Sequence, residues 1–306
     1  MPVPVKAPAA SLRMLLEAII DYAGLFPPSL LEMPESVANY AQYLASPHRW
    51  MLGRFVLPAA RLPEFRDVRE RLPGGEWQLS ATISGDLAAE LATVEQFNRS
   101  AAGAVVDCVE LRVNALDEIE RVHANRPAGV NIFFEIAPER AGELLPFIRN
   151  SGERAKLRIG GVVEAAFPEV ERVAAFLARC AELGLAFKAT AGLHHPLRCT
   201  RALTYEPESP VGTMHGFLNL FTAAAIAWSM AQAGRPVSRK IVATCLADHE
   251  LSNWHFAGDG LTWSGDLEPI RFELDELRAV REHFALSFGS CSFVEPVEEL
   301  REMNLL

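Results

Sequence analysis

Six charged side chains lie within four short apolar segments of the sequence, at positions where packing alone would favour Val, Ile or Leu. The segments are 105–113, 130–136, 156–160 and 185–191, and the six residues are Glu110, Arg112, Glu135, Lys156, Arg158 and Lys188. A seventh charged residue, Asp107, has the opposite parity and would point away from the barrel axis. Successive side chains of a strand point to opposite faces, so each segment would present its charges on one face and its apolar residues on the other. We predict that the four segments direct these charges into one interior.

The elements that must position these charges form a regular pattern of strands and helices. Short segments rich in Val, Ile, Phe and Thr alternate with amphipathic stretches, which indicates parallel strands joined by right-handed crossovers. Strands are predicted at 52–57, 78–83, 105–113, 130–136, 156–160 and 185–191, and helices at 62–72, 87–100, 116–125, 139–150 and 167–183.

This alternation predicts a single-domain α/β protein with the (β/α)8 TIM-barrel fold. Residues 1–50 would form an N-terminal helical extension and residues 51–306 the barrel. The seventh strand would lie at 253–257 or 261–263, two segments that could also pair as a hairpin, and the eighth at 286–290. An open doubly wound sheet is the alternative, but no Gly-rich nucleotide-binding loop follows any strand.

Most of the charges lie near the C-terminal ends of their strands, where barrels of this kind carry their active sites. Burying a lone charge costs several kcal/mol, so these groups must pair with one another or contact a ligand. The pattern favours a ligand-binding and catalytic interior. A buried ion-pair network without chemistry is the alternative.

The loops after the strands carry further polar residues. His194 and His195 lie in the long loop 192–212, and His215 follows it, which suggests proton transfer or metal binding over the barrel mouth. Each could instead be an ordinary hydrogen-bonded surface histidine. Gly160 and Gly161 end the 156–160 strand, where backbone N–H groups could approach an anion or simply form a tight turn. The string 21–28, Asp-Tyr-Ala-Gly-Leu-Phe-Pro-Pro, could edge the site.

Two strings resemble motifs of the deoxyribose-phosphate aldolases. The first, Phe-Lys-Ala-Thr-Ala-Gly at 187–192, is similar to that family's sixth-strand signature, which contains a Schiff-base lysine. The second, Phe-Gly-Ser-Cys-Ser at 288–292, is similar to its phosphate grip on the last strand. In the family a second lysine motif follows on the next strand, whereas the nearest string here, 156–162, precedes Lys188. The resemblance implies an imine-forming role for Lys188, with a substrate anion near Thr190, Gly192, Gly289, Ser290 and Ser292.

Our leading hypothesis is therefore a lyase that acts on a small carbonyl substrate bearing a carboxylate or phosphate. Lys188 would form an imine with the carbonyl carbon, which requires that burial and nearby cations lower its pKa. Proton transfer would fall to Glu110 or Glu135, and His194 or His195 would cover the mouth. The anion would bind to Arg112, Arg158 and Lys156. A salt bridge from Lys188 to Glu110 or Glu135 is the alternative.

Two other functions remain open. In the first, Glu110, Glu135 and either His194 or His195 would hold a divalent metal ion in a lyase, isomerase or hydrolase. In the second, the charged interior would bind a small anion without chemistry. No other cofactor is predicted.

The composition limits the partners of the chain. A net charge of −10 disfavours nucleic acid and anionic membranes as partners. The five cysteines are scattered without a CxxC pair, which is typical of a reduced, cytoplasmic compartment. The Ala-rich stretch 223–227 is expected to pack either on the barrel or in a homodimer interface.

Overall fold

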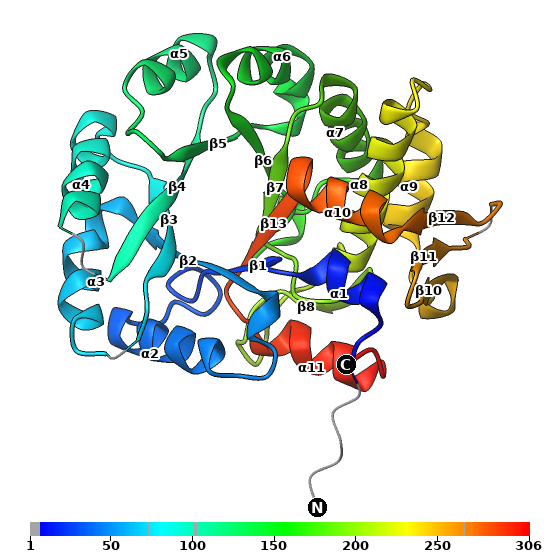
Figure 1. Cartoon of the computed structure of the whole chain (residues 1–306), viewed down its shortest axis with the longest axis horizontal. Helices are drawn as coiled ribbons and strands as arrows, with labels where there is room; N and C mark the ends of the chain where they lie inside the picture. Colours follow the sequence, from blue (N-terminus) through cyan, green and yellow to red (C-terminus); the bar gives the residue numbers. More distant parts are fainter. Residues whose placement is uncertain (1–6, 73, 101–102, 266) are drawn as a thin grey trace, which may run out of the picture.

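The computed structural model describes residues 7–72, 74–100, 103–265 and 267–306, and its centre is a closed barrel of eight parallel strands (Figure 1). The predicted (β/α)8 TIM barrel is thus confirmed. In chain order the barrel strands are β1 (Ile20–Tyr22), β2 (Leu52–Pro58), β3 (Trp77–Ile83), β4 (Ala104–Arg112), β5 (Asn131–Glu135), β6 (Arg154–Arg158), β7 (Phe187–Thr190) and β13 (Ala285–Ser290).

Helices surround the outside of the barrel (Figure 1). They are α1 (Ala10–Leu16), α2 (Met33–Leu44), α3 (Leu62–Arg69), α4 (Leu87–Arg99), α5 (Leu116–Ala124), α6 (Ala141–Ser151), α7 (Val170–Leu183), α8 (Phe217–Gln232), α9 (Arg239–Ala247), α10 (Leu274–His283) and α11 (Val294–Glu302). Short 3-10 helices lie at Arg49–Met51, Ala59–Arg61, Pro138–Arg140, Glu164–Ala166 and Leu251–Asn253.

Strand β1 corrects the predicted domain boundary. It lies between α1 and α2, inside the proposed extension 1–50, and it pairs in parallel with β2 on one side and β13 on the other. A separate extension ending at residue 50 is therefore wrong for the described residues, and residues 1–6 lie outside them. The correction shifts the strand count by one, so that Lys156 lies on the sixth barrel strand and Lys188 on the seventh.

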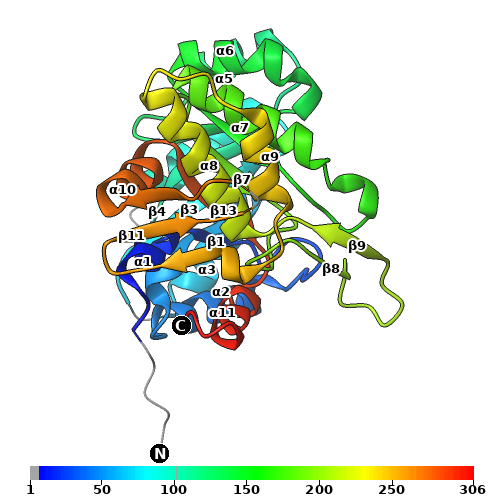
Figure 2. The ribbon, with the colours of Figure 1, turned by 90° about the vertical axis from the view of Figure 1, so that its right-hand side faces the viewer.

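The predicted seventh strand is also wrong, because both candidate segments lie outside the barrel. They form β10 (Trp254–Phe256) and β11 (Gly260–Trp263), an antiparallel hairpin as anticipated, and β12 (Ile270–Glu273) joins them in a separate sheet. A second small sheet, β8 (Cys199–Ala202) with β9 (Val211–Met214), occupies the long loop after β7 and extends beyond the barrel (Figure 2).

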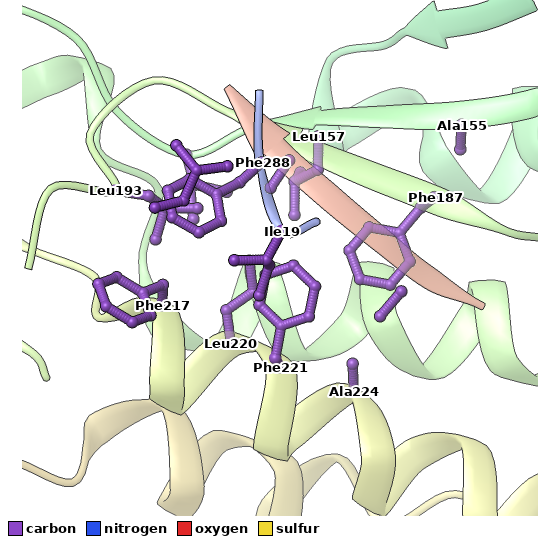
Figure 3. Packing of buried hydrophobic residues seen from close by; sticks show 14 of the residues in the cluster. Ile19, Ala155, Leu157, Phe187, Leu193, Phe217, Leu220, Phe221, Ala224 and Phe288 are labelled. Atoms are coloured by element: carbon purple, nitrogen blue, oxygen red, sulfur yellow. The ribbon is translucent and has the colours of Figure 1, made fainter. Parts of the chain in front are cut away.

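Aromatic packing on the outer face of the strands fixes which side chains point inward. Phe217 and Phe221 of α8 pack against Phe288 of β13, with ring centroids 5.4 Å and 6.1 Å apart (Figure 3). Phe187 of β7 is fully buried in the same layer. Because side chains alternate along a strand, the neighbour of Phe187, Lys188, must point to the barrel axis.

Helix α8 packs against its own chain. Residues 223–227 are almost completely buried within the single chain, so they pack on the barrel and its neighbouring helices and not in a dimer interface. None of the helices in the described ranges combines the length and the hydropathy needed to cross a bilayer.

Candidate active site

A chain of alternating charges crosses the barrel interior, and it begins at Lys188. The Lys188 Nζ donates to Asp21 Oδ2 at 2.6 Å and to Glu110 Oε1 at 2.5 Å. Ser80 Oγ donates to the same oxygen of Glu110. The exposed fractions of Asp21, Lys188 and Glu110 are 0%, 1% and 2%, so these three charged groups are almost completely buried.

The chain of charges continues through Lys156 to the cavity. Lys156 Nζ lies 2.9 Å from Glu110 Oε2 and 2.8 Å from Glu135 Oε2, and Arg158 Nε donates to Glu135 Oε1 at 2.9 Å. The register of β5, β6 and β7 places Glu135 beside Lys156 and Lys156 beside Lys188. The prediction that these segments direct their charges into one interior is confirmed.

The mutual pairing fixes the protonation of this network. Burial alone would raise the pKa of Glu110, but the ammonium groups of Lys156 and Lys188 outweigh it and hold that pKa well below its ordinary value. Burial alone would lower the pKa of Lys188, but Asp21 and Glu110 outweigh it and raise that pKa. Lys188 is therefore a protonated, paired cation at neutral pH. The expected lowering of its pKa for nucleophilic attack is wrong for this structure.

Asp21 is the member of the network that sequence reasoning missed. Its Oδ1 accepts the backbone N–H of Arg54 at 2.8 Å, and its Oδ2 accepts Ser287 Oγ at 2.7 Å besides Lys188. A Cβ at Gly53 would lie only 2.4 Å from Asp21 Oδ1, so glycine is required for this approach. The sequence did contain a signal, because a buried acid between apolar residues needs a cation.

A cavity of about 480 Å³ lies at the C-terminal ends of the barrel strands. Glu110, Glu135 and Lys156 line it, whereas Asp21 and Lys188 do not. The strand-end residues Arg112 and Arg158 line it as well, together with Thr82, Ile83 and Thr190. The cavity therefore meets the buried charges at Lys156 and its two carboxylates.

Two arginines give the cavity its capacity for an anion. Arg112 has no hydrogen-bond or ion-pair partner among the described residues, and Arg158 bonds to Glu135 through Nε only. The guanidinium groups thus retain donors that suit a carboxylate or phosphate. Apolar side chains line the rest of the cavity. The predicted edge segment 21–28 contributes four of them, Ala23, Phe26, Pro27 and Pro28, and Val56, Leu203 and Met214 also line it.

The predicted small residues divide into two groups. Gly161, Thr190, Gly192 and Gly289 line the cavity. Gly160 does not, and its backbone packs tightly on Gly192, because a Cβ at Gly160 would lie 2.6 Å from Gly192 Cα.

The two predicted serines do not line the cavity, so their proposed contact with a substrate anion is not supported. Ser290 Oγ donates to the carbonyl oxygen of Ser292, and Ser292 Oγ accepts the backbone N–H of Glu295 at the start of α11. Both hydroxyls are used in the turn that leads from β13 into α11.

The three predicted histidines differ in whether they line the cavity. His194 lines the cavity, with Nδ1 2.8 Å from Glu295 Oε2. His195 turns away and pairs with Glu299, as expected for adjacent residues that point in different directions. His215 is buried outside the cavity, with Nε2 2.8 Å from the Pro168 carbonyl oxygen, and burial lowers its pKa to about 4. Substrate contact by His215 is therefore not supported.

The predicted metal-binding arrangement is not formed. Glu110 and Glu135 share the ammonium of Lys156, while His194 and His195 each pair with an acid of α11. Across residues 7–72, 74–100, 103–265 and 267–306, no group of three or more His, Cys, Asp or Glu side chains is placed to hold a metal ion.

Comparisons with known proteins add little beyond the fold. No protein-family model matches the sequence, and no curated protein sequence matches it. A similar solved structure is the deoxyribose phosphate aldolase from Aeropyrum pernix, described as a unique tetrameric structure, with 14% identity and a TM-score of 0.42. The match covers 60% of this chain and 80% of that one. A likeness this distant carries no information on the site.

Proposed function

We propose that this chain is a lyase that binds a small carbonyl compound bearing a carboxylate or phosphate and activates it as an imine. One observation carries the proposal: the ammonium of Lys156 lies between Glu110 and Glu135 in the lining of a cavity that also presents Arg112, a cation without a partner among the described residues. Arginine suits the anionic end of such a substrate, and a lysine suits its carbonyl.

Lys156 is a better candidate for the imine than Lys188. Lys188 does not line the cavity, and its Nζ is already bonded to the carboxylates of Asp21 and Glu110. Lys156 lines the cavity directly. On the corrected strand count the string around Lys188 lies on the seventh strand, so its match to a sixth-strand signature is lost. Lys156 lies on the sixth strand, and Lys188 follows it on the next, which is the order of the two lysines in the family that the strings resemble. Lys188 then acts as a positioning residue that holds Glu110.

Imine formation begins with the loss of a proton from Lys156. Burial alone would lower the pKa of Lys156, but Glu110 and Glu135 outweigh it and raise that pKa. Glu135 is the better acceptor for the proton, because Glu110 is held as an anion by Lys188 and Ser80. The neutral Nζ then attacks the carbonyl carbon, and the C=O electron pair moves to oxygen.

The proton that Glu135 accepted is used again when the carbinolamine loses water. The carbinolamine oxygen takes one proton from Nζ and a second from Glu135, leaves as water, and gives a protonated imine. Because the protonated imine carries the same positive charge as the ammonium that it replaces, both carboxylates keep a cationic partner. The network thus stabilises the reacting species without rearrangement.

A second candidate function is the binding of a small anion without chemistry. The resting protonation of both lysines favours it, since neither amine is a nucleophile before a proton moves. The two functions share the anion site and differ in the covalent step.

Reductive trapping separates them. The protein is incubated with borohydride and a panel of keto acids, aldehydes and their phosphates, weighed intact, and then digested to locate the adduct. We expect an adduct on Lys156 in the wild type and none in Lys156→Arg, which keeps the cation. An adduct confined to Lys188 would contradict the choice of lysine. Absence of any adduct, with ligands that still raise the melting temperature, would favour the binding function.

A further inference from the structure

Three side chains beside the cavity form a hydrogen-bonded line that the lysine chemistry leaves unused. Cys291 directly follows β13, His194 lies in the loop after β7, and Glu295 lies in the first turn of α11. Cys291 Sγ is 3.9 Å from His194 Nε2, and His194 Nδ1 is 2.8 Å from Glu295 Oε2. This is the order of groups that activates a thiol: a sulfur, an imidazole and a carboxylate that orients the imidazole.

The surroundings hold this line in place. Tyr205 donates its hydroxyl proton to Glu295 Oε2 at 3.0 Å and lies 3.8 Å from Cys291 Sγ. Ser29 Oγ contacts the carbonyl oxygen of Cys291 at 3.3 Å. Three segments that are remote in the chain, those of Ser29, His194 and Tyr205, therefore converge on Cys291. Among the described residues, the titratable groups that act on Cys291 are His194 and Tyr205 by direct contact and Tyr22 through its charge, and Glu295 acts through its bonds to His194 and Tyr205.

Charge pairing changes the ionisation of the two reactive groups. Burial alone would raise the pKa of Cys291, but the bond to His194 outweighs it and lowers that pKa. Burial alone would lower the pKa of His194, but Cys291 and Glu295 outweigh it and raise that pKa to about 10. The pair is therefore arranged as a thiolate beside an imidazolium.

Cys291 differs in this from the other four cysteines. Cys180 and Cys245 are fully buried and their thiol pKa values are raised by burial. Burial raises the pKa of Cys108 to about 11, and that of the half-buried Cys199 also to about 11. Only Cys291, of the five, has a lowered pKa and lines the cavity that Lys156 lines.

We propose that Cys291, His194 and Glu295 form a relay in which the Cys291 thiolate moves a proton to and from the substrate carbon next to the imine. This role rests on the proposed function of Lys156. The thiolate takes the proton from that carbon, the C–H electron pair becomes the C=C bond of an enamine, and the imine C=N pair moves to nitrogen. The thiol returns the proton when the enamine is quenched. The substrate class is accordingly a carbonyl acid or phosphate with a hydrogen on the adjacent carbon.

The relay is tested first without any substrate, by alkylation with iodoacetamide at pH values from 5 to 9 and mass mapping of each cysteine. We expect Cys291 to react at pH 6 at least tenfold faster than Cys199, which serves as the internal control. Each unit of pKa changes the thiolate fraction about tenfold at a pH below both values. In His194→Gln the alkylation of Cys291 at pH 6 should fall at least tenfold, and in Glu295→Gln by a smaller factor. Equal rates at Cys291 and Cys199 at pH 6 would overturn the relay.

The proton-transfer role is tested with a keto acid that gives the Lys156 adduct. Wild-type protein should exchange the adjacent C–H of that compound with D2O, followed by proton NMR. Cys291→Ser should lose at least 90% of the exchange and still give the borohydride adduct, which also shows that the variant is folded. Unchanged exchange in Cys291→Ser would overturn the role of the thiolate. If no compound forms an adduct, the proposed function fails and the base role with it, while the alkylation profile still decides whether the relay exists.

Discussion

Lys188 Nζ lies 2.6 Å from Asp21 Oδ2, and the two residues stand 167 positions apart in the chain. Asp21 lies on β1 and Lys188 on β7, with β13 between them in the barrel. Their pairing therefore crosses the interior instead of following a strand-to-strand contact. Because the two exposed fractions are 0% and 1%, neither group is open to bulk solvent.

Replacing Asp21 by Asn should destabilise the fold strongly. Removal of one partner from a buried ion pair typically costs about 3–5 kcal/mol, and we expect about 3 because Lys188 keeps Glu110. Urea unfolding at pH 7 measures the change. Asp275→Asn is the matched control, since Asp275 pairs with Arg278 at the surface and should cost less than about 1 kcal/mol. Similar losses in both variants would contradict a structural role for the Asp21–Lys188 pair.

Asp21 also shows where strand periodicity stopped being informative. Alternation alone placed Glu110, Glu135, Lys156 and Lys188 in one interior, because each lies on a strand long enough to show its two faces. Strand β1 has three residues, and its central Asp21 interrupts the apolar pattern, so no periodicity identified it. Since β1 was missed, strands β2 to β7 were each counted one place too low, and the wrongly predicted seventh strand restored the count at β13.

Contacts between remote segments were equally beyond sequence reasoning. His194 pairs with Glu295, about a hundred residues later in the chain, and no local spacing in the sequence predicts that pair. The loop histidines were therefore recognised as a group, but which of them would reach the cavity depended on where α11 packs. The same holds for Ser290 and Ser292, whose hydroxyls are taken by the turn before that helix.

Stability should fall as the pH is lowered below about 5, with Glu110 as a main contributor. Its pKa in the folded protein lies below the ordinary value of 4.5, so its stabilising contribution is present above pH 4.5 and is lost as pH falls toward the folded pKa. Urea unfolding at half-unit steps from pH 7 to 3 should show this loss. Glu110→Gln should be less stable at pH 7 and should lose less between pH 5 and 3. An unchanged slope would contradict this assignment.

The contribution of Lys188 to stability depends on pH in the opposite sense to that of Glu110. Lys188 has a raised pKa in the folded protein, so its contribution is complete below its ordinary value of 10.5 and is lost only as pH rises through the folded pKa. We therefore expect no loss of unfolding free energy from the deprotonation of Lys188 between pH 7 and 10. Lys188→Met should remove its contribution at every pH in that range. A loss in the wild type that is absent from Lys188→Met would contradict the paired ammonium.

Gly53→Ala should destabilise the protein through a single methyl group. The added Cβ would meet Asp21 Oδ1 at 2.4 Å and the Ala18 carbonyl oxygen at 3.2 Å, so strand β2 or Asp21 must move. Overpacking of this kind costs about 1–3 kcal/mol. Gly142→Ala on α6 is the matched control, because nothing lies within 4 Å of its Cβ and alanine favours a helix by about 0.5–1 kcal/mol. The two substitutions should therefore shift the urea midpoint in opposite directions.

Arg112→Leu should weaken the binding of a carboxylate or phosphate ligand and leave the fold intact. Arg112 has no partner in the described part of the chain, so its removal strands no other charge, and unfolding free energy should stay within about 0.5 kcal/mol of wild type. A hydrogen bond to a charged group contributes about 1.5–3 kcal/mol, which corresponds to a loss in affinity of about 10- to 150-fold. Calorimetric titration with a compound that raises the melting temperature of the wild type measures this loss in affinity.

Arg121→Leu is the control for this loss. Arg121 carries the same charge on the exposed face of α5, where it pairs with Asp117, and it does not line the cavity. It tests whether the loss of one positive charge anywhere on the protein, and not the loss of a local contact, lowers the affinity. We expect no more than a twofold change in affinity for Arg121→Leu. If both variants lost affinity equally, or if Arg112→Leu lost none, the anion would bind elsewhere, and the carbonyl would not be presented to Lys156 in the way that the imine requires.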